Sequence, residues 1–166
     1  CLDTSGIMFP KKHTGTDQIS EREISLTGIS ENMASDRMEK TEQLMSVTDL
    51  VMLDIKHIND EEHQKLTGQS NSNILAFARY LDSIGKPVWI RHVVVPGITF
   101  DEKELTELGL FLKTLHNVEK LEVLPYHSMG KVKYDNLGMD YVLKDTPQLT
   151  KAEAKEAENM IRAAMK

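Results

Sequence analysis

The order of apolar and polar positions along the chain predicts strands and helices that alternate. Short apolar runs typical of buried strands occupy residues 50–53, 88–95 and 118–124, and residues 1–6 suit the end of another strand. Between these runs apolar residues recur at helical spacing, so we expect helices near residues 36–45, 60–66, 74–84, 101–115 and 151–165. Such alternation is typical of parallel β/α units joined by right-handed crossovers, and it predicts an α/β fold.

Two stretches lack this periodicity. Residues 7–35 are polar and longer than most connections in a compact domain, so we expect a flexible insertion, with a lid or docking loop as the alternative. Residues 128–149 are also polar, and we expect them to be irregular. Thr150 then stands three residues before Glu153, which is the spacing of a capping box and marks the start of the last helix.

Composition and charge limit the class of protein. The 166 residues suit one domain, and the formal net charge of −6 argues against nucleic acid or an anionic membrane as a partner. Because no apolar run approaches the ~20 residues of a membrane span and no signal peptide opens the chain, we expect a cytoplasmic protein. The sequence begins at its single cysteine, Cys1, in what looks like the end of a strand, and we interpret it as a fragment whose N-terminal part is missing.

Charged and polar side chains stand where the predicted strands end. The residues at or near the exits of four successive strands are Asp3, Asp54, Lys56, Arg91 and His127. Because parallel strands end at one rim of a sheet, we expect these five side chains to meet there. The carboxylates suit a cation or an ammonium group, whereas Lys56 and Arg91 suit a carboxylate or a phosphate. His127 is suited to donate a hydrogen bond or to move a proton.

Each of these residues also has a purely structural interpretation. Asp54 and Lys56 lie on one side of their strand because side chains alternate, and they could simply form an ion pair. Arg91 could fill the interior of a barrel by pairing with an acid, and His127 could bond to the backbone of a loop. Four further histidines lack the spacing of metal ligands, and we expect them to be solvated or satisfied in the core: His57, His63, His92 and His116.

Four ordered segments carry a resemblance to a known family. They are CLDTSG at residues 1–6, VTDLVMLDIK at 47–56, VWIRHVVVPG at 88–97 and LEVLPYH at 121–127. These segments resemble the C-terminal half of the pyruvate formate-lyase activating enzymes, a family of radical S-adenosylmethionine enzymes. The resemblance covers nearly the whole chain except residues 7–35, where the segment is longer than the family usually shows.

The resemblance implies a fold, a reaction and a set of partners. The implied fold is the C-terminal part of a partial (β/α)6 barrel, similar to a TIM barrel, which holds a [4Fe–4S] cluster and S-adenosylmethionine. The reduced cluster cleaves S-adenosylmethionine to a 5′-deoxyadenosyl radical, which takes a hydrogen from one glycine of pyruvate formate-lyase and activates that enzyme for anaerobic glucose metabolism. The implied protein partners are the glycine loop of pyruvate formate-lyase and an electron donor such as flavodoxin.

The resemblance also implies roles for individual residues. Those that it places around S-adenosylmethionine are Asp54, Ile55, Lys56, Arg91 and His127, and it places Arg91 in the adjoining substrate-peptide site as well. Those that it places in a monovalent-cation site beside the cofactor's carboxylate are Asp3, Thr4, Met52 through its carbonyl, and Asp54. The family's CxxxCxxC cluster loop is absent, and Cys1 matches a strand residue rather than an iron–sulfur ligand. We therefore expect no cluster and no radical chemistry from residues 1–166 alone.

Other hypotheses stay open at this point. The chain could be part of an activator of another glycyl-radical enzyme, or Lys56 could form a Schiff base in an aldolase-like barrel. It could also be an inactive fragment, or a module whose long loop binds a partner. Because an incomplete barrel exposes a strand edge and apolar surface, we expect the isolated chain to be marginally stable or to associate.

Overall fold

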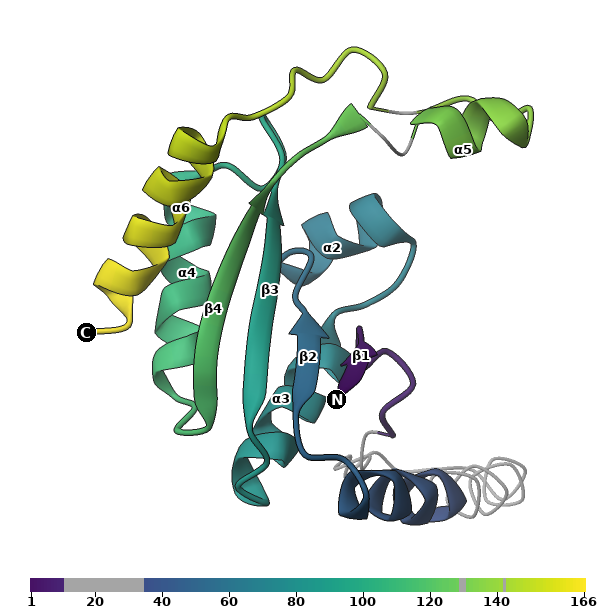
Figure 1. The fold of residues 1–166 in the computed structure, drawn as a ribbon, viewed down its shortest axis with the longest axis vertical. Coiled ribbons are helices and arrows are strands. Elements are labelled where there is room, and N and C mark those ends of the chain that lie inside the picture. Colours follow the sequence, from purple (N-terminus) through teal and green to yellow (C-terminus); the bar gives the residue numbers. More distant parts are fainter. Residues whose placement is uncertain (11–34, 129–130, 142) are drawn as a thin grey trace, which may run out of the picture.

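The fold is built on one sheet of four parallel strands (Figure 1). The computed structural model describes residues 1–10, 35–128, 131–141 and 143–166. The strands lie side by side in chain order, and they are β1 (Leu2–Thr4), β2 (Val51–Asp54), β3 (Val88–Val94) and β4 (Val118–Pro125). Every neighbouring pair is parallel, so the predicted α/β fold with parallel strands is confirmed.

The register of the strands brings charged residues to one region of the sheet. Asp54 of β2 is paired with Arg91 of β3, and Arg91 is paired with Glu122 of β4. Asp3 of β1 is paired with Met52, two residues before Asp54. Since paired residues of neighbouring strands point to the same side and side chains alternate along a strand, all five side chains lie on one face of the sheet.

Helices join the strands and begin and end at recognisable signals. They are α2 (Asp60–Thr67), α3 (Ser72–Ser83), α4 (Glu102–Lys113), α5 (Lys131–Asn136) and α6 (Lys151–Ala164), and residues 35–46 are helical as well. The Asn59 side chain caps the start of α2, and Gly68 ends it in the left-handed conformation. The predicted capping box of Thr150 and Glu153 is present at the start of α6. Helix α5 corrects the prediction that residues 128–149 are irregular.

The hydrophobic core lies between one face of the sheet and helices α3, α4 and α6. Val51, Leu53 and Ile90 point into this core from the strands, and Leu112 of α4 and Ile161 of α6 meet them; all five are fully buried. Burial of each such side chain contributes roughly 1.5–3 kcal/mol relative to exposure. Along β2 and β3 every second residue is buried and the others are only half-buried, so the helices cover one face.

Helices α4 and α6 pack closely because α4 carries a glycine where they meet. A Cβ atom at Gly109 would lie 2.4 Å from the carbonyl oxygen of Ile161 and 2.6 Å from the Cβ of Ala164. Both distances are far shorter than van der Waals contact, so a larger residue would push the helices apart. The close approach allows α6 to lie along α4 and to cover the edge strand β4 (Figure 1).

The first residues after β1 belong to the packed core. The ring of Phe9 lies 5.2 Å from that of Phe77 and 5.1 Å from that of Tyr80, measured between centroids, so Phe9 is held against α3, whereas its neighbour Met8 is exposed. Residues 11–34, which make up most of the predicted flexible insertion at 7–35, lie outside the described residues, and that insertion stays a prediction.

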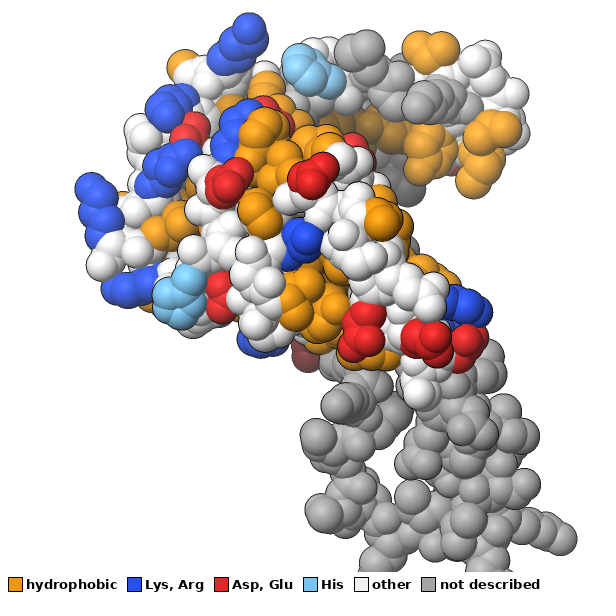
Figure 2. All heavy atoms as spheres, turned by 60° about the horizontal axis from the view of Figure 1, so that its bottom comes forward, with side chains coloured by type: hydrophobic (Ala, Val, Ile, Leu, Met, Phe, Trp, Pro, Cys, Tyr) orange, Lys and Arg blue, Asp and Glu red, His pale blue; other side chains and the backbone are white. Residues whose placement is uncertain are grey.

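The surface mixes charged and apolar side chains. Figure 2 turns the end of the molecule where the strands begin toward the viewer, and it shows exposed apolar surface between basic side chains, which gather at the left, and acidic ones. Val47 and Ile84, which lie shortly before β2 and β3, are among the exposed large apolar residues. No helix in the described ranges has both the length and the apolar character needed to cross a membrane.

Candidate functional site

The candidate site lies on the face of the sheet that points away from the core, which we name the open face. Its side chains are half-buried or exposed and come from alternate positions of the strands, and they are Asp3, Met52, Asp54, Trp89, Arg91, Val93, Lys120, Glu122 and Leu124. Lys56 follows β2 with the same alternation. The face is therefore made of charged groups from every strand, with apolar side chains between them.

Four of the predicted site residues form a continuous acid–base chain on the open face. Arg91 Nε donates to Asp54 Oδ1 at 2.7 Å, and Arg91 Nη2 donates to Asp3 Oδ1. Lys56 Nζ donates to the other oxygen of Asp54, Oδ2, at 2.6 Å. The order is Asp3, Arg91, Asp54, Lys56, so two carboxylates alternate with two cations. The prediction that strand ends bring these groups together is confirmed for these four.

The electrostatics of the acid–base chain centre on Asp54. Burial raises the pKa of this carboxyl, but hydrogen bonds from Lys56 and Arg91, together with their charges, outweigh burial and lower the pKa below its usual value. The hydrogen bond to Asp54 raises the pKa of Arg91 above its usual value, against the opposing effect of burial, and Asp3 adds to the rise. Asp54 is thus an ionised acceptor whose two oxygens are held by two different cations.

Two other predicted residues, Ile55 and Thr4, point their side chains away from the open face. The side chain of Ile55 is fully buried in the core, so only its backbone is available to a ligand on the open face. Thr4 points to the opposite face from Asp3, and its hydroxyl accepts a hydrogen bond from the Gly6 N–H at 3.0 Å. Any contribution of Thr4 to a cation site would therefore come from its carbonyl, like that of Met52.

His127 is the predicted site residue that the structure does not join to the others. It is exposed and follows the end of β4, which reaches past the end of β2 in Figure 1. Its neighbour Tyr126 is buried and fixed, since its hydroxyl shares a hydrogen bond of 2.8 Å with that of Tyr141. Burial and this hydrogen bond raise the pKa of Tyr126 to about 12. Within the described part of the chain, no hydrogen bond connects His127 with Asp54 or Lys56, and its role stays a prediction.

The open face also contains a cluster that the sequence reasoning missed. Lys120 Nζ lies 4.6 Å from the centre of the Trp89 ring and 2.9 Å from the Glu122 carboxylate. Trp89 lies two residues before Arg91 in β3 and is paired with Lys120, while Arg91 itself is paired with Glu122. The alternation of side chains along β4 could have predicted this cluster from the sequence, because Lys120, Glu122 and Leu124 occupy every second position.

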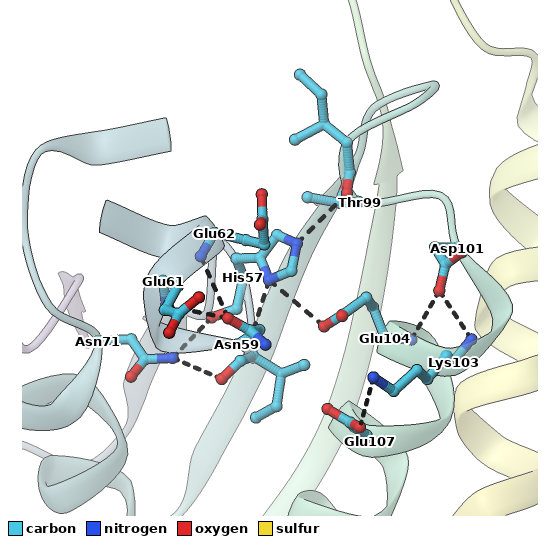
Figure 3. A network of polar contacts seen from close by, with 12 residues as sticks. His57, Asn59, Glu61, Glu62, Asn71, Thr99, Asp101, Lys103, Glu104 and Glu107 are labelled. Carbon is cyan, nitrogen blue, oxygen red and sulfur yellow. Dashed lines mark hydrogen bonds and ion pairs between the residues drawn. The ribbon is translucent and has the colours of Figure 1, made fainter. Parts of the chain in front are cut away.

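Behind the open face a network of buried polar groups holds the segment after Lys56 (Figure 3). His57 is buried, its Nδ1 accepts from the Asn59 N–H at 3.2 Å, and its Nε2 donates to the Ile98 carbonyl at 3.3 Å. The carboxylate of Glu104, near the start of α4, lies 3.6 Å from the same Nδ1. Glu104, His57 and His92 line a small cavity on the core side of the sheet, away from the acid–base chain.

Of the remaining histidines one is solvated and two are buried with one ring nitrogen satisfied, while Nε2 of both buried rings has no hydrogen-bond partner among the described residues. His63 is buried, with its Nδ1 2.7 Å from the Gln69 carbonyl, and His92 is buried against the Ile55 carbonyl. His116 is exposed beside Asp82. The described residues contain no group of three histidine, cysteine or acidic side chains arranged to hold a metal ion.

A solved structure resembles the fold of the chain. It is the crystal structure of a domain of pyruvate-formate lyase-activating enzyme from Bacteroides vulgatus, with a TM-score of 0.61 over 76% of this chain and 69% of that one, at 20% sequence identity. The fold and the site together define the chain as an α/β protein with charged groups on the open face of a parallel sheet, consistent with part of a TIM-like barrel.

Two curated proteins resemble the chain in sequence. The chain is 52% identical over 124 residues to the pyruvate formate-lyase-activating enzyme of Streptococcus mutans. The matched region covers 75% of this chain and 47% of that protein. The chain is 50% identical over 116 residues to the enzyme of the same name from Staphylococcus epidermidis, covering 70% and 46%. No family model matches the chain.

The chain is therefore a relative of the pyruvate formate-lyase-activating enzymes, and the resemblance predicted from the four sequence segments is confirmed. It spans about half the length of the curated relatives that it matches.

Proposed function

We propose that the chain is part of an enzyme that activates pyruvate formate-lyase under anaerobic conditions by generating a glycyl radical, with S-adenosylmethionine and a [4Fe–4S] cluster as cofactors. The observation that carries the proposal is the acid–base chain of Asp3, Arg91, Asp54 and Lys56, in a sequence about half identical to activating enzymes. Because the chain spans about half of those relatives, we assign the complete activity to a longer protein.

The residues of the open face fit the amino acid part of S-adenosylmethionine. That part is a zwitterion, so it needs a cation for its carboxylate and acceptors for its ammonium group. Lys56 and Arg91 would receive the carboxylate, and Asp54 or Asp3 would receive the ammonium group. The backbone of Ile55 and the imidazole of His127 are the further contacts that we propose. When bound and reductively cleaved, the cofactor supplies the radical that takes a hydrogen from glycine.

The role of the open face would be to bind and orient. Two carboxylates alternating with two cations hold each other in place before a ligand arrives, so little reorganisation is needed when a zwitterion exchanges with them. This arrangement also disfavours the alternative in which Lys56 forms a Schiff base. That chemistry needs an amine that is free to attack a carbonyl, whereas Lys56 Nζ is bound to the Asp54 carboxylate at 2.6 Å.

The [4Fe–4S] cluster does not fit the residues of this chain. A cluster of this kind is held by several cysteine thiolates, and the sequence has one cysteine, which is exposed next to the edge strand β1. We therefore assign cluster binding to the part of the longer protein that this chain does not contain, and we derive no step through it from these residues.

A monovalent cation beside the cofactor carboxylate is also part of the proposal. Its ligands would be Asp3, the carbonyls of Thr4 and Met52, and Asp54. Because the Arg91 guanidinium bridges Asp3 and Asp54, a cation would have to displace it from one of them. The expected consequence is that binding of the cofactor depends on the concentration of the added monovalent ion.

The partners follow from the reaction. We propose the glycine loop of pyruvate formate-lyase as the substrate, an electron donor such as flavodoxin, and a cytoplasmic location. The second candidate is the same chemistry on another glycyl-radical enzyme, because binding of S-adenosylmethionine by the open face does not depend on which glycine loop is the target.

The test joins the chain to the preceding half of the Streptococcus mutans relative and reconstitutes the cluster. We expect this hybrid to generate a glycyl radical on pyruvate formate-lyase, observed by electron paramagnetic resonance, and the 166-residue chain to generate none. Asp54→Asn should reduce the rate of radical formation, whereas Asp49→Asn, an exposed carboxylate before β2, should not. A hybrid that holds the cluster and binds S-adenosylmethionine yet forms no radical on this target would contradict the proposal.

A further inference from the structure

The peptide that follows Asp54 is fixed from the core side of the sheet. Strand β2 ends at Asp54, whereas its neighbour β3 continues to Val94. The N–H of Ile55 still donates to the Arg91 carbonyl at 3.0 Å. The Ile55 carbonyl lies 2.8 Å from Nδ1 of the buried His92. A side chain of β3 thus holds β2 where regular pairing of the strands stops.

The hydrogen bond defines the state of the His92 ring. A carbonyl oxygen only accepts, so the hydrogen must be on Nδ1. Burial lowers the pKa of His92 to about 4, against the raising effect of the bond to Ile55 and with a smaller lowering by the charges of His57 and Lys56. The ring is therefore neutral near pH 7. Its Nε2 is buried without a hydrogen-bond partner among the described residues, which is a cost that simple filling of the core would avoid.

The two sides of the sheet are coupled through neighbouring residues. Arg91 directly precedes His92 in β3, and Asp54 directly precedes Ile55 at the end of β2. On the open face Arg91 Nε holds the Asp54 carboxylate at 2.7 Å, and on the core face His92 holds the next peptide. Rotation of the Ile55 peptide would move both Asp54 and Lys56, which flank it.

A second buried side chain continues the same fixation. Asn71 stands at the N-cap position of α3 but makes no side-chain capping bond there. Its amide instead donates to the His57 carbonyl at 3.1 Å and to the Ile58 carbonyl at 2.6 Å. The carbonyls of residues 55, 57 and 58 are thus all held by buried side chains.

We propose that His92 is a positioning residue for the open-face site, because its Nδ1–H holds the Ile55 carbonyl and so sets how Asp54 and Lys56 meet Arg91. The inference deepens the proposed function, since it concerns the residues proposed to bind S-adenosylmethionine. It does not make His92 a ligand, because its ring lies on the opposite side of the sheet.

Two substitutions separate positioning from filling of the core. His92→Asn keeps a hydrogen-bond donor on Cγ, in the place of Nδ1, but loses most of the ring volume. His92→Phe keeps the volume and loses the donor. If His92 only fills space, Phe is the better replacement; if it positions Ile55, Asn is. The two roles therefore predict opposite rankings of the variants when the order of the open-face site is measured.

The readout is the Arg91 Nε–H signal in a nitrogen-15 NMR spectrum of the 166-residue chain, which needs no ligand and is recorded at a concentration where sedimentation shows a monomer. We expect its hydrogen exchange in His92→Asn to stay within about twofold of the wild type, and in His92→Phe to become roughly five- to tenfold faster. His92→Gln, whose amide nitrogen lies one bond farther out, should behave like Phe and replaces it if that variant does not fold. Equal exchange in all variants, or slower exchange in Phe than in Asn, would overturn the inference.

Titration with S-adenosylmethionine distinguishes this inference from the proposed function. In the hybrid enzyme we expect the dissociation constant to rise about five- to tenfold in His92→Phe and little in His92→Asn. A wild-type hybrid that does not bind the cofactor would contradict the proposed function, while the Arg91 signal would still decide the role of His92.

Discussion

At the scale of single residues, Asp54 is the group on which the open face depends. Its two oxygens accept from two different cations, Arg91 and Lys56, and it lies in the middle of the acid–base chain. Loss of its charge would leave both cations half-buried without their main counter-charge. Because hydrogen bonds to a charged group contribute about 1.5–3 kcal/mol each when shielded from water, this residue affects stability as well as binding.

The first prediction follows from the pKa of Asp54. Asp54→Asn should lower the free energy of unfolding by about 2 kcal/mol near pH 7. Pairing lowers the pKa of Asp54 in the folded chain, so its contribution is complete above the unfolded value of about 4 and is lost as the pH falls through the lower folded value. The difference between wild type and variant should therefore shrink below about pH 4.

Urea unfolding at several pH values measures this difference. Asp49→Asn is the matched control, since Asp49 is exposed before β2, and it should leave the free energy of unfolding nearly unchanged over the same range. A difference between wild type and Asp54→Asn that stays constant from pH 7 to pH 3 would show that the ionised carboxylate is not the source of the effect.

Sequence alone predicted the acid–base chain better than its surroundings. Period-two alternation put Asp54 and Lys56 on one side, and parallel strands placed Arg91 beside them, as the register confirms. The partner of an arginine is not encoded by spacing, so the bond from Arg91 to Asp3 emerged only from the structure. The position of His127 could not be derived, because it follows a strand end where alternation stops.

At the scale of elements, two helices begin at an asparagine that is used in different ways. Asn59 at the start of α2 accepts hydrogen bonds from the backbone of Glu61 and Glu62, as capping residues usually do. Asn71 at the start of α3 instead donates to the carbonyls of His57 and Ile58. The same residue type thus caps one helix and anchors a loop at the other.

This contrast predicts that the same substitution, Asn to Asp, has a large effect at one helix start and a small effect at the other. Asn71→Asp removes both donors and places a carboxylate against two carbonyl oxygens, so we expect a loss of about 1–3 kcal/mol in the free energy of unfolding. Asn59→Asp keeps the accepting oxygen and should change stability by only ~0.5 kcal/mol. Urea midpoints of the two variants test this. Equal losses would mean that Asn71 acts as an ordinary cap.

Helix α5 shows where prediction of elements from sequence stops. Among the helices that the sequence predicted, α3, α4 and α6 have one buried stripe that repeats over two or more turns, as Leu105, Leu108 and Leu112 do in α4. Helix α5 has six residues, which is too short for such a repeat, and its Val132 and Tyr134 are exposed. A helix without a buried stripe leaves no periodic signal to detect.

At the scale of the whole molecule, the sheet is covered on one side. Helices α3, α4 and α6 bury one face, while the open face presents Trp89, Val93 and Leu124 between its charges. Among the described residues, β1 pairs with a strand on one side alone. Both features favour association of the isolated chain, because an unpaired edge and exposed apolar surface are templates for contact.

We therefore expect the isolated 166-residue chain to associate as its concentration rises, with the open face as the contact. Leu124→Lys should weaken this association, because Leu124 is an exposed leucine of the open face and a charge there opposes contact between two copies. Leu110→Lys is the matched control, since Leu110 is equally an exposed leucine but lies on α4, away from the sheet. Sedimentation velocity over a hundredfold range of concentration, with reductant to keep Cys1 free, measures the difference. A concentration-independent monomer, or equal weakening by both substitutions, would remove the open face as the cause.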